Sequence, residues 1–154
     1  MFNEYVVTGD LRIDDFLHLT TPLPIVGENF ASITGVVAFR NNESKLLPRD
    51  AGDLVLGAPA LAAFGPGQTF ARVGLPGVPT IPEPLTVTIS HVSDTDTFVP
   101  ILSSDESALL VPGGGVTVPT GQISAPVLVT GIAQSAAVTL TASIDDIVLA
   151  ADVR

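Results

Sequence analysis

The sequence contains no cysteine, and only six of its 154 residues are basic. Without cysteine, and with only two separated histidines, it has no ligand cluster of the kind that transition metals require. No cluster of lysine and arginine is present, which excludes nucleic acid and anionic membrane surfaces as expected partners. No segment approaches the roughly 18 consecutive apolar residues of a membrane-spanning helix, so membrane insertion is not expected.

Charge is scarce altogether, and most of it is negative. Only 14% of the residues are charged, against about 25% in an average soluble protein. The formal net charge is −10. Residues 1–73 hold 5 basic and 8 acidic side chains, and residues 74–154 hold 1 basic and 8 acidic, giving −3 and −7. This uneven distribution favours two modules.

The composition that remains is typical of short strands joined by tight turns. The chain is 46% hydrophobic, with 14 glycines and 13 prolines distributed along its length. Glycine and proline break helices and favour turns, whereas valine, isoleucine and threonine favour strands. We therefore expect an all-β protein.

In the first module, residues 4–19 predict a bent strand or a hairpin that turns at Gly9-Asp10. Residues 30–40 predict one strand, followed by a turn at Asn41-Asn42-Glu43. Residues 59–64 form the only segment with a helical pattern, and it is short. Four prolines in residues 74–84 predict an extended linker. The expected domains are 1–73, a linker at 74–84, and 85–154.

The second module shows clear two-residue periodicity. Leu85, Val87 and Ile89 alternate with polar residues, and the same holds for alternate residues from Val138 to Ile144. Asp145-Asp146 predicts a two-residue turn before a last strand. Six or seven short strands at intervals of about 8–12 residues predict a β-sandwich.

This second module resembles the immunoglobulin-like (Ig-like) repeats of bacterial surface proteins. The matching segments are Ile101–Glu106, Val111-Pro112, Gly115–Pro119, Gly121, Ser124-Ala125, Val138–Ile144 and Ala150–Val153. The family usually has alanine where Thr120 stands here. The resemblance implies an extracellular spacer or adhesive module without catalytic residues.

The first module resembles the later strands of an OB-like barrel of extracellular proteins. The matching segments are Gly27-Glu28, Ile33–Val37, Lys45–Arg49 and Asp53–Val55. Glu28 occupies a position where that pattern usually has aspartate. The resemblance implies a partial barrel, because the earlier barrel strands are missing or merged into residues 4–19. An incomplete barrel leaves an open strand edge with unpaired N–H and C=O groups, so we expect such an edge in this module.

The sequence offers no catalytic machinery and no cofactor motif. His18 and His91 are the only histidines and lie in different modules, and no Gly-x-Ser-x-Gly segment is present. Solvated turn carboxylates are the ordinary explanation of the acidic loops. Calcium is the alternative, since it prefers carboxylate oxygens. Its candidate ligands are Asp94, Asp96 and Asp105, with Asp145-Asp146 as a further contributor and Asp14-Asp15 as a separate pair.

Three classes of function stay open at this level. We expect a non-catalytic, extracellular or cell-surface structural protein that self-associates through β-strand pairing, by the N-terminal segment 2–7 or the strand 147–153. The alternative is an adhesion or carbohydrate-binding module, which would need exposed aromatic residues on one face of residues 1–73. A hydrolase appendage or enzyme would need a histidine beside an aspartate and a serine in a cleft.

Overall fold

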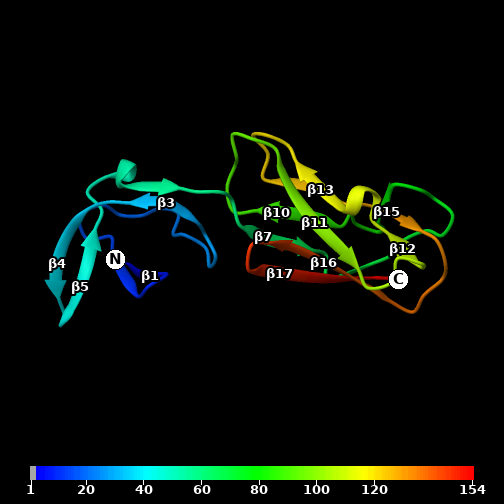
Figure 1. Ribbon diagram of the computed structural model, residues 1–154, viewed down its shortest axis with the longest axis horizontal. Coiled ribbons are helices and arrows are strands. Elements are labelled where there is room, and N and C mark those ends of the chain that lie inside the picture. The colour runs from blue at the N-terminus through cyan, green and yellow to red at the C-terminus, as the bar shows by residue number, and fades with distance from the viewer. Residues whose placement is uncertain (1–2) are drawn as a thin grey trace. The chain divides into compact units, whose positions relative to one another are not determined.

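A computed structural model describes residues 3–154 and divides the chain at Ala58/Pro59 into two compact units. Unit 1 is Met1–Ala58 and unit 2 is Pro59–Arg154 (Figure 1). Both units are built from strands, which confirms the all-β class. The helical residues that the structure describes form two 3₁₀ turns, η1 (Ala51–Asp53) and η2 (Pro112–Gly114). None of the described helices is long and apolar enough to cross a membrane.

Unit 1 contains a four-stranded sheet in the order β1-β2-β5-β4. Its strands are β1 (Glu4–Val7), β2 (Leu11–Asp14), β4 (Val36–Arg40) and β5 (Glu43–Leu47). The β1–β2 and β4–β5 pairs are antiparallel hairpins, and β2 pairs with β5 in parallel. The predicted hairpin in residues 4–19 is thus confirmed for its first part, up to Asp14. Strands β1 and β4 are the two edges of this sheet.

The strand predicted over residues 30–40 is two strands separated by a bend. Strand β3 (Phe30–Ile33) pairs with β6 (Leu54–Leu56), whereas β4 pairs with β5. The bend falls at Gly35, where a Cβ atom would lie 2.4 Å from the carbonyl oxygen of Leu47. Glycine is required there because backbone passes directly over backbone.

Unit 2 is sandwich-like, with two layers of strands around one core. One layer is a five-stranded sheet in the order β13-β11-β16-β17-β8. Its strands are β8 (Gln68–Thr69), β11 (Thr97–Ser103), β13 (Gly115–Val118), β16 (Val138–Ile144) and β17 (Ile147–Val153). The β16–β17 hairpin turns at Asp145-Asp146, as predicted, since Ile144 pairs with Ile147.

The second layer consists of two short sheets, and the continuous segment 124–131 supplies one strand to each of them. Strand β14 (Ser124–Pro126) belongs to the sheet β14-β10-β7, with β10 (Thr86–Ile89) and β7 (Leu61–Gly65). After Val127 the chain continues as β15 (Leu128–Gly131), which pairs with β12 (Leu109–Leu110) and β9 (Val78–Pro79).

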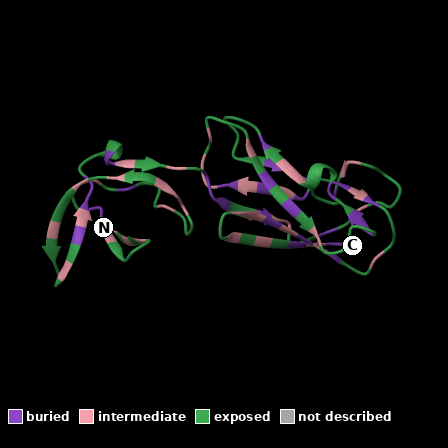
Figure 2. Cartoon of the chain, viewed as in Figure 1, coloured by how far each residue is buried: buried purple, intermediate pink, exposed green. Residues whose placement is uncertain are grey.

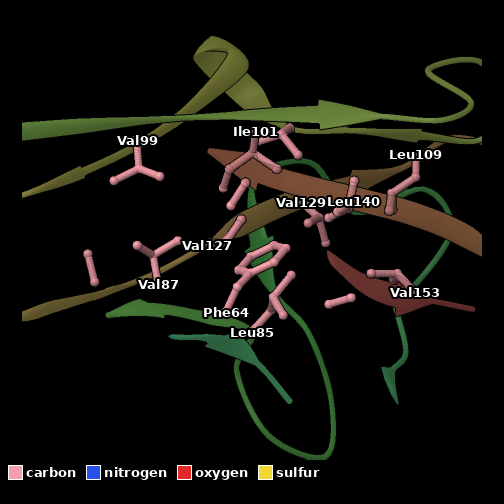
Figure 3. Packing of buried hydrophobic residues seen from close by; sticks show 14 of the residues in the cluster. Phe64, Leu85, Val87, Val99, Ile101, Leu109, Val127, Val129, Leu140 and Val153 are labelled. Carbon is pink, nitrogen blue, oxygen red and sulfur yellow. The ribbon is translucent and has the colours of Figure 1, made fainter. Parts of the chain in front are cut away.

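The predicted alternation in unit 2 sets which side chains are buried. Leu85, Val87 and Ile89 are at most 2% exposed, and Val138, Leu140 and Ala142 lie opposite them in the same core cluster. Figure 3 shows Val99, Ile101 and Leu140 from one layer facing Phe64, Leu85 and Val87 from the other. Burial of about 25 cal/mol per Å² of apolar surface makes this cluster the main source of stability in unit 2.

Two expectations about local structure differ from what the chain adopts. Residues 61–65 form strand β7 rather than a helix, because pairing with β10 outweighs a weak local preference. The segment 74–84, expected to be a linker, belongs to unit 2. Its Thr80 is 2% exposed, with a hydroxyl that accepts from the N–H of Leu85 and donates to the carbonyl of Glu83. The boundary between units therefore lies at Ala58/Pro59.

Candidate functional site

A network of opposite charges lies on one face of the unit 1 sheet. Strand alternation puts Glu4, Asp14 and Lys45 on the same face of β1, β2 and β5. The Lys45 side chain is 1% exposed, with Nζ in contact with Glu4 Oε1 and 3.5 Å from Asp14 Oδ2. The hydrogen bond with Glu4 is the main reason that the pKa of Lys45 is raised. A raised pKa keeps this amine protonated, which suits an ion pair and not a nucleophile.

Arg12 extends the same network to Glu43, the first residue of β5. Its Nε donates to Glu43 Oε2 at 2.8 Å, and its Nη1 lies 3.9 Å from Glu4 Oε2. Positive and negative groups thus alternate across three strands. A buried charge left without its partner is strongly destabilising, so the network holds β1, β2 and β5 in one register.

Two further buried carboxylates in unit 1 are fully engaged by hydrogen bonds. Asp15 accepts from the Asn3 backbone N–H at 2.5 Å, from Asn3 Nδ2 at 3.1 Å and from the Thr20 N–H at 3.3 Å. Asp53 accepts from Arg49 Nη2 at 2.7 Å, from Arg49 Nε at 2.8 Å and from Thr34 Oγ1 at 2.5 Å. The Arg49 hydrogen bonds are the main cause of a pKa of Asp53 well below its usual range. Both carboxylates tie together non-strand segments that flank the strands of unit 1.

The three predicted calcium ligands are not brought together. Asp96 precedes β11, and Asp105 follows it; the seven residues of β11 span about 23 Å. Asp96 accepts hydrogen bonds from the Thr120 N–H at 2.8 Å and from the Thr120 hydroxyl at 2.9 Å. Asp105 accepts from the Ser107 N–H at 3.0 Å and from the Ser107 hydroxyl at 2.6 Å. Asp94 is exposed. These hydrogen bonds lower the pKa of Asp96 and of Asp105. Residues 3–154 contain no group of three His, Cys, Asp or Glu side chains arranged to hold a metal ion.

The other acidic pairs and the histidines are also dispersed. Asp14 and Asp15 belong to the contacts of unit 1 described above, and Asp145-Asp146 lies in the β16–β17 turn. His18 is half-buried in unit 1. His91 Nδ1 in unit 2 lies 2.9 Å from Ser90 Oγ, which itself accepts from the Ala60 N–H at 3.0 Å.

Aromatic residues in unit 1 do not form a common platform. Tyr5 and Phe30 stack with centroids 6.5 Å apart, and burial raises the pKa of Tyr5. The guanidinium of Arg40 covers Phe16 at 4.0 Å from the ring centroid. Phe39 is 70% exposed and, as the neighbour of Arg40, points to the opposite face of β4. A sugar-stacking surface would need two such rings side by side.

A shallow groove lies on the surface of unit 2. It has a volume of about 550 Å³. The lining is mostly apolar and includes Phe70, Val73, Leu109 and Val138, and its one charged residue is Arg154. A groove of this composition presents no set of converging polar groups for catalysis.

Unit 1 has an inverted burial, by which we mean that its buried residues are mostly polar and its large apolar side chains are mostly exposed. Of the 22 buried hydrophobic residues in the described chain, only Ile13 and Leu47 belong to unit 1, whereas five of the seven buried polar residues do. Figure 2 shows how buried residues concentrate in unit 2. Thirteen large apolar side chains are exposed in unit 1: Val6, Leu11, Phe16, Leu17, Leu19, Leu23, Ile25, Val26, Val36, Val37, Phe39, Val55 and Leu56. Exposed apolar surface marks an interaction site where it forms one contiguous patch.

Three of these thirteen exposed side chains, Val36, Val37 and Phe39, lie on the edge strand β4, and six lie in the segment 16–26. Val37 is 74% exposed and Phe39 is 70% exposed, and both lie on the face opposite the charge network. Sequence reasoning predicted an open edge in this module but did not single out β4. The available signal was the sequence Val36-Val37-Ala38-Phe39, four apolar residues without a charge or a proline.

Comparisons with protein-family models, with curated proteins and with solved structures found no match to this chain.

Proposed function

We propose that this chain is a non-catalytic structural module of an extracellular or cell-surface assembly, in which unit 1 joins subunits and unit 2 is a rigid spacer. The observation that carries the proposal is the inverted burial of unit 1. An antiparallel sheet normally has one face packed on a core. In the unit 1 sheet the ion pairs lie on one face, and apolar side chains of the edge strand β4 are exposed on both faces.

Unit 2 has the opposite character, which suits a spacer. Its core brings together 19 buried residues from both layers. Its edge strands carry the features that block edge-to-edge association. Strands β9 and β14 contain Pro79 and Pro126, β7 and β13 are followed at once by Pro66 and Pro119, and β8 and β12 are two residues long.

The extracellular location rests on the Ig-like resemblance of residues 85–153 and on the acidic, cysteine-free composition. Protease treatment of intact cells should release fragments of a surface protein. Recovery of the intact chain with the cytosolic fraction would overturn this part of the proposal.

Assembly is tested by sedimentation equilibrium of the full chain over roughly a thousandfold range of concentration. The chain has a mass of 15.8 kDa. The proposal expects the weight-average mass to rise above this value as concentration increases. A mass that stays at that of the monomer throughout the range would refute self-assembly. The adhesive or carbohydrate-binding alternative stays a prediction, tested by the same chain in a glycan-binding assay.

A further inference from the structure

We infer that the joining edge of unit 1 is strand β4, which pairs antiparallel with β4 of a second copy in a register centred on Ala38. This inference rests on the proposed self-assembly and names its surface and its partner. Both β1 and β4 are edges of the unit 1 sheet. The two edges differ in how well they are protected.

Strand β4 has little of the usual protection of an exposed edge, because its one charged residue, Arg40, lies at its end. Residues Val36 to Phe39 include no charge and no proline, and β4 pairs with β5 over all five residues without a bulge. Strand β1 begins with Glu4, a charged residue engaged with Lys45. The long apolar edge is therefore β4. Strand β4 also contains no carboxylate, although the net charge of the chain is −10. Two β4 strands can therefore approach each other without direct repulsion between acidic groups.

The turn that follows β4 determines which backbone groups face the open side. Asn41 and Asn42 have φ values of 53° and 65°, as a two-residue type I′ turn requires. In such a hairpin the flanking pair, Arg40 and Glu43, exchanges both backbone hydrogen bonds, and Ala38 with Lys45 is the next pair of this kind. The N–H and C=O groups of Val37 and Phe39 must then point away from β5, toward the open edge.

A second β4 strand satisfies these groups when Ala38 lies opposite its own counterpart. Val37 then lies opposite Phe39 of the second copy, and Phe39 opposite its Val37, so each pair forms two N–H···O bonds. Aromatic and β-branched residues are a favourable cross-strand pair, and the symmetry supplies it twice. Such a contact is isologous, which is the commonest symmetry among homo-oligomers.

The same register keeps the two arginines apart. Arg40 lies opposite Val36, so the Arg40 positions of the two copies are displaced by four residues, or about 13 Å. That separation exceeds the Debye length of about 8 Å at physiological ionic strength. Each guanidinium can stay over the Phe16 ring of its own copy. Only one strand of five residues from each copy takes part in this contact, so the dimer should depend on concentration.

The absence of native cysteine gives a direct test, because a single introduced thiol can pair only with itself in another copy. In the proposed register the two Ala38 Cα atoms are about 4.5 Å apart, within the range that a disulfide spans. Ala38→Cys should give a covalent dimer under mild oxidation, in a yield that rises with concentration. Val148→Cys, at a site 58% exposed on β17 of unit 2, is the matched control and should stay largely monomeric. Equal yields from the two variants would overturn the inference.

A second pair of variants separates the two edges. Val37→Pro removes an N–H that the β4–β5 hairpin does not use. Val6→Pro does the same on β1: the Asp15 N–H donates to the Asn3 carbonyl, so the backbone groups of every second residue from Asn3 face β2 and those of Val6 face outward. We expect Val37→Pro to sediment as a monomer and Val6→Pro to associate like the parent. The reverse result would assign the joining edge to β1 and leave the proposed function intact. A parent chain that is monomeric at every concentration would refute both.

Discussion

Replacement of Leu140 by alanine tests the core of unit 2 with a magnitude set by the structure. Leu140 lies on β16, is 0% exposed and faces the opposite layer of the sandwich (Figure 3). Truncation of a fully buried leucine costs about 2–5 kcal/mol, because lost transfer free energy adds to the cost of the cavity. Leu102 on the neighbouring strand β11 is 68% exposed and supplies the matched control. Leu102→Ala should change the free energy of unfolding by no more than about 0.5 kcal/mol.

The assay is thermal unfolding followed by calorimetry. In a domain of 60–100 residues, 1 kcal/mol corresponds to about 4–8 °C in Tm, and unit 2 has 96 residues (59 to 154). A loss of about 3 kcal/mol from Leu140→Ala therefore lowers the Tm of unit 2 by roughly 12–24 °C. The control should move it by less than about 4 °C. Similar shifts in the two variants would show that β16 does not face a closed core.

Three further predictions follow from particular groups. Gly35→Ala should lower the stability of unit 1 and leave the Tm of unit 2 unchanged, because the new Cβ would lie 2.4 Å from a backbone oxygen. The control is Gly67→Ala, whose new Cβ would have nothing within 4 Å. Equal losses of stability from the two variants would contradict the close backbone approach at Gly35. The pKa of Asp53 is lowered on folding, so Asp53 stabilises unit 1 above its unfolded pKa of about 3.8, and this stabilisation is lost as pH falls below that value. The urea midpoint of unit 1 should therefore decrease as the pH is lowered from about 5 to about 2. Asp53→Asn should reduce this pH dependence. Excess chelator should leave the melting curve unchanged, because Asp96 and Asp105 lie at opposite ends of β11 and cannot share one calcium ion. A lower Tm after removal of calcium would contradict this prediction.

The parts of the fold that the sequence predicts well are those with strong periodicity. The alternation around Val87 and Leu140 predicted inward faces that are buried, and Asp145-Asp146 predicted the turn where it occurs. Composition near the linker was misleading. The prolines in residues 74–84 predicted an extended linker, yet the hydroxyl of Thr80 ties this segment to Leu85, directly before β10. Such a tie depends on contacts that a local pattern does not contain.

The candidate site was predictable in kind but not in place. An incomplete barrel predicted an open edge in the first module, and the structure has such edges. Of the two strands proposed for pairing, β1 is an edge, whereas β17 lies between β16 and β8. The buried position of Lys45 was not predicted, because lysine is seldom buried without partners and its partners come from two other strands.

The central claim, that copies join through the open edge of β4, is tested most directly by amide hydrogen exchange at Val37 and Phe39. Nuclear magnetic resonance can follow these two amides at low and at high protein concentration. The account predicts fast exchange at low concentration, where both N–H groups face solvent, and protection at high concentration, where they bond to a second strand. The N–H of Ala38, directed toward β5, should be protected in both conditions. Fast exchange at Val37 and Phe39 in a sample whose mass shows assembled chains would contradict the account.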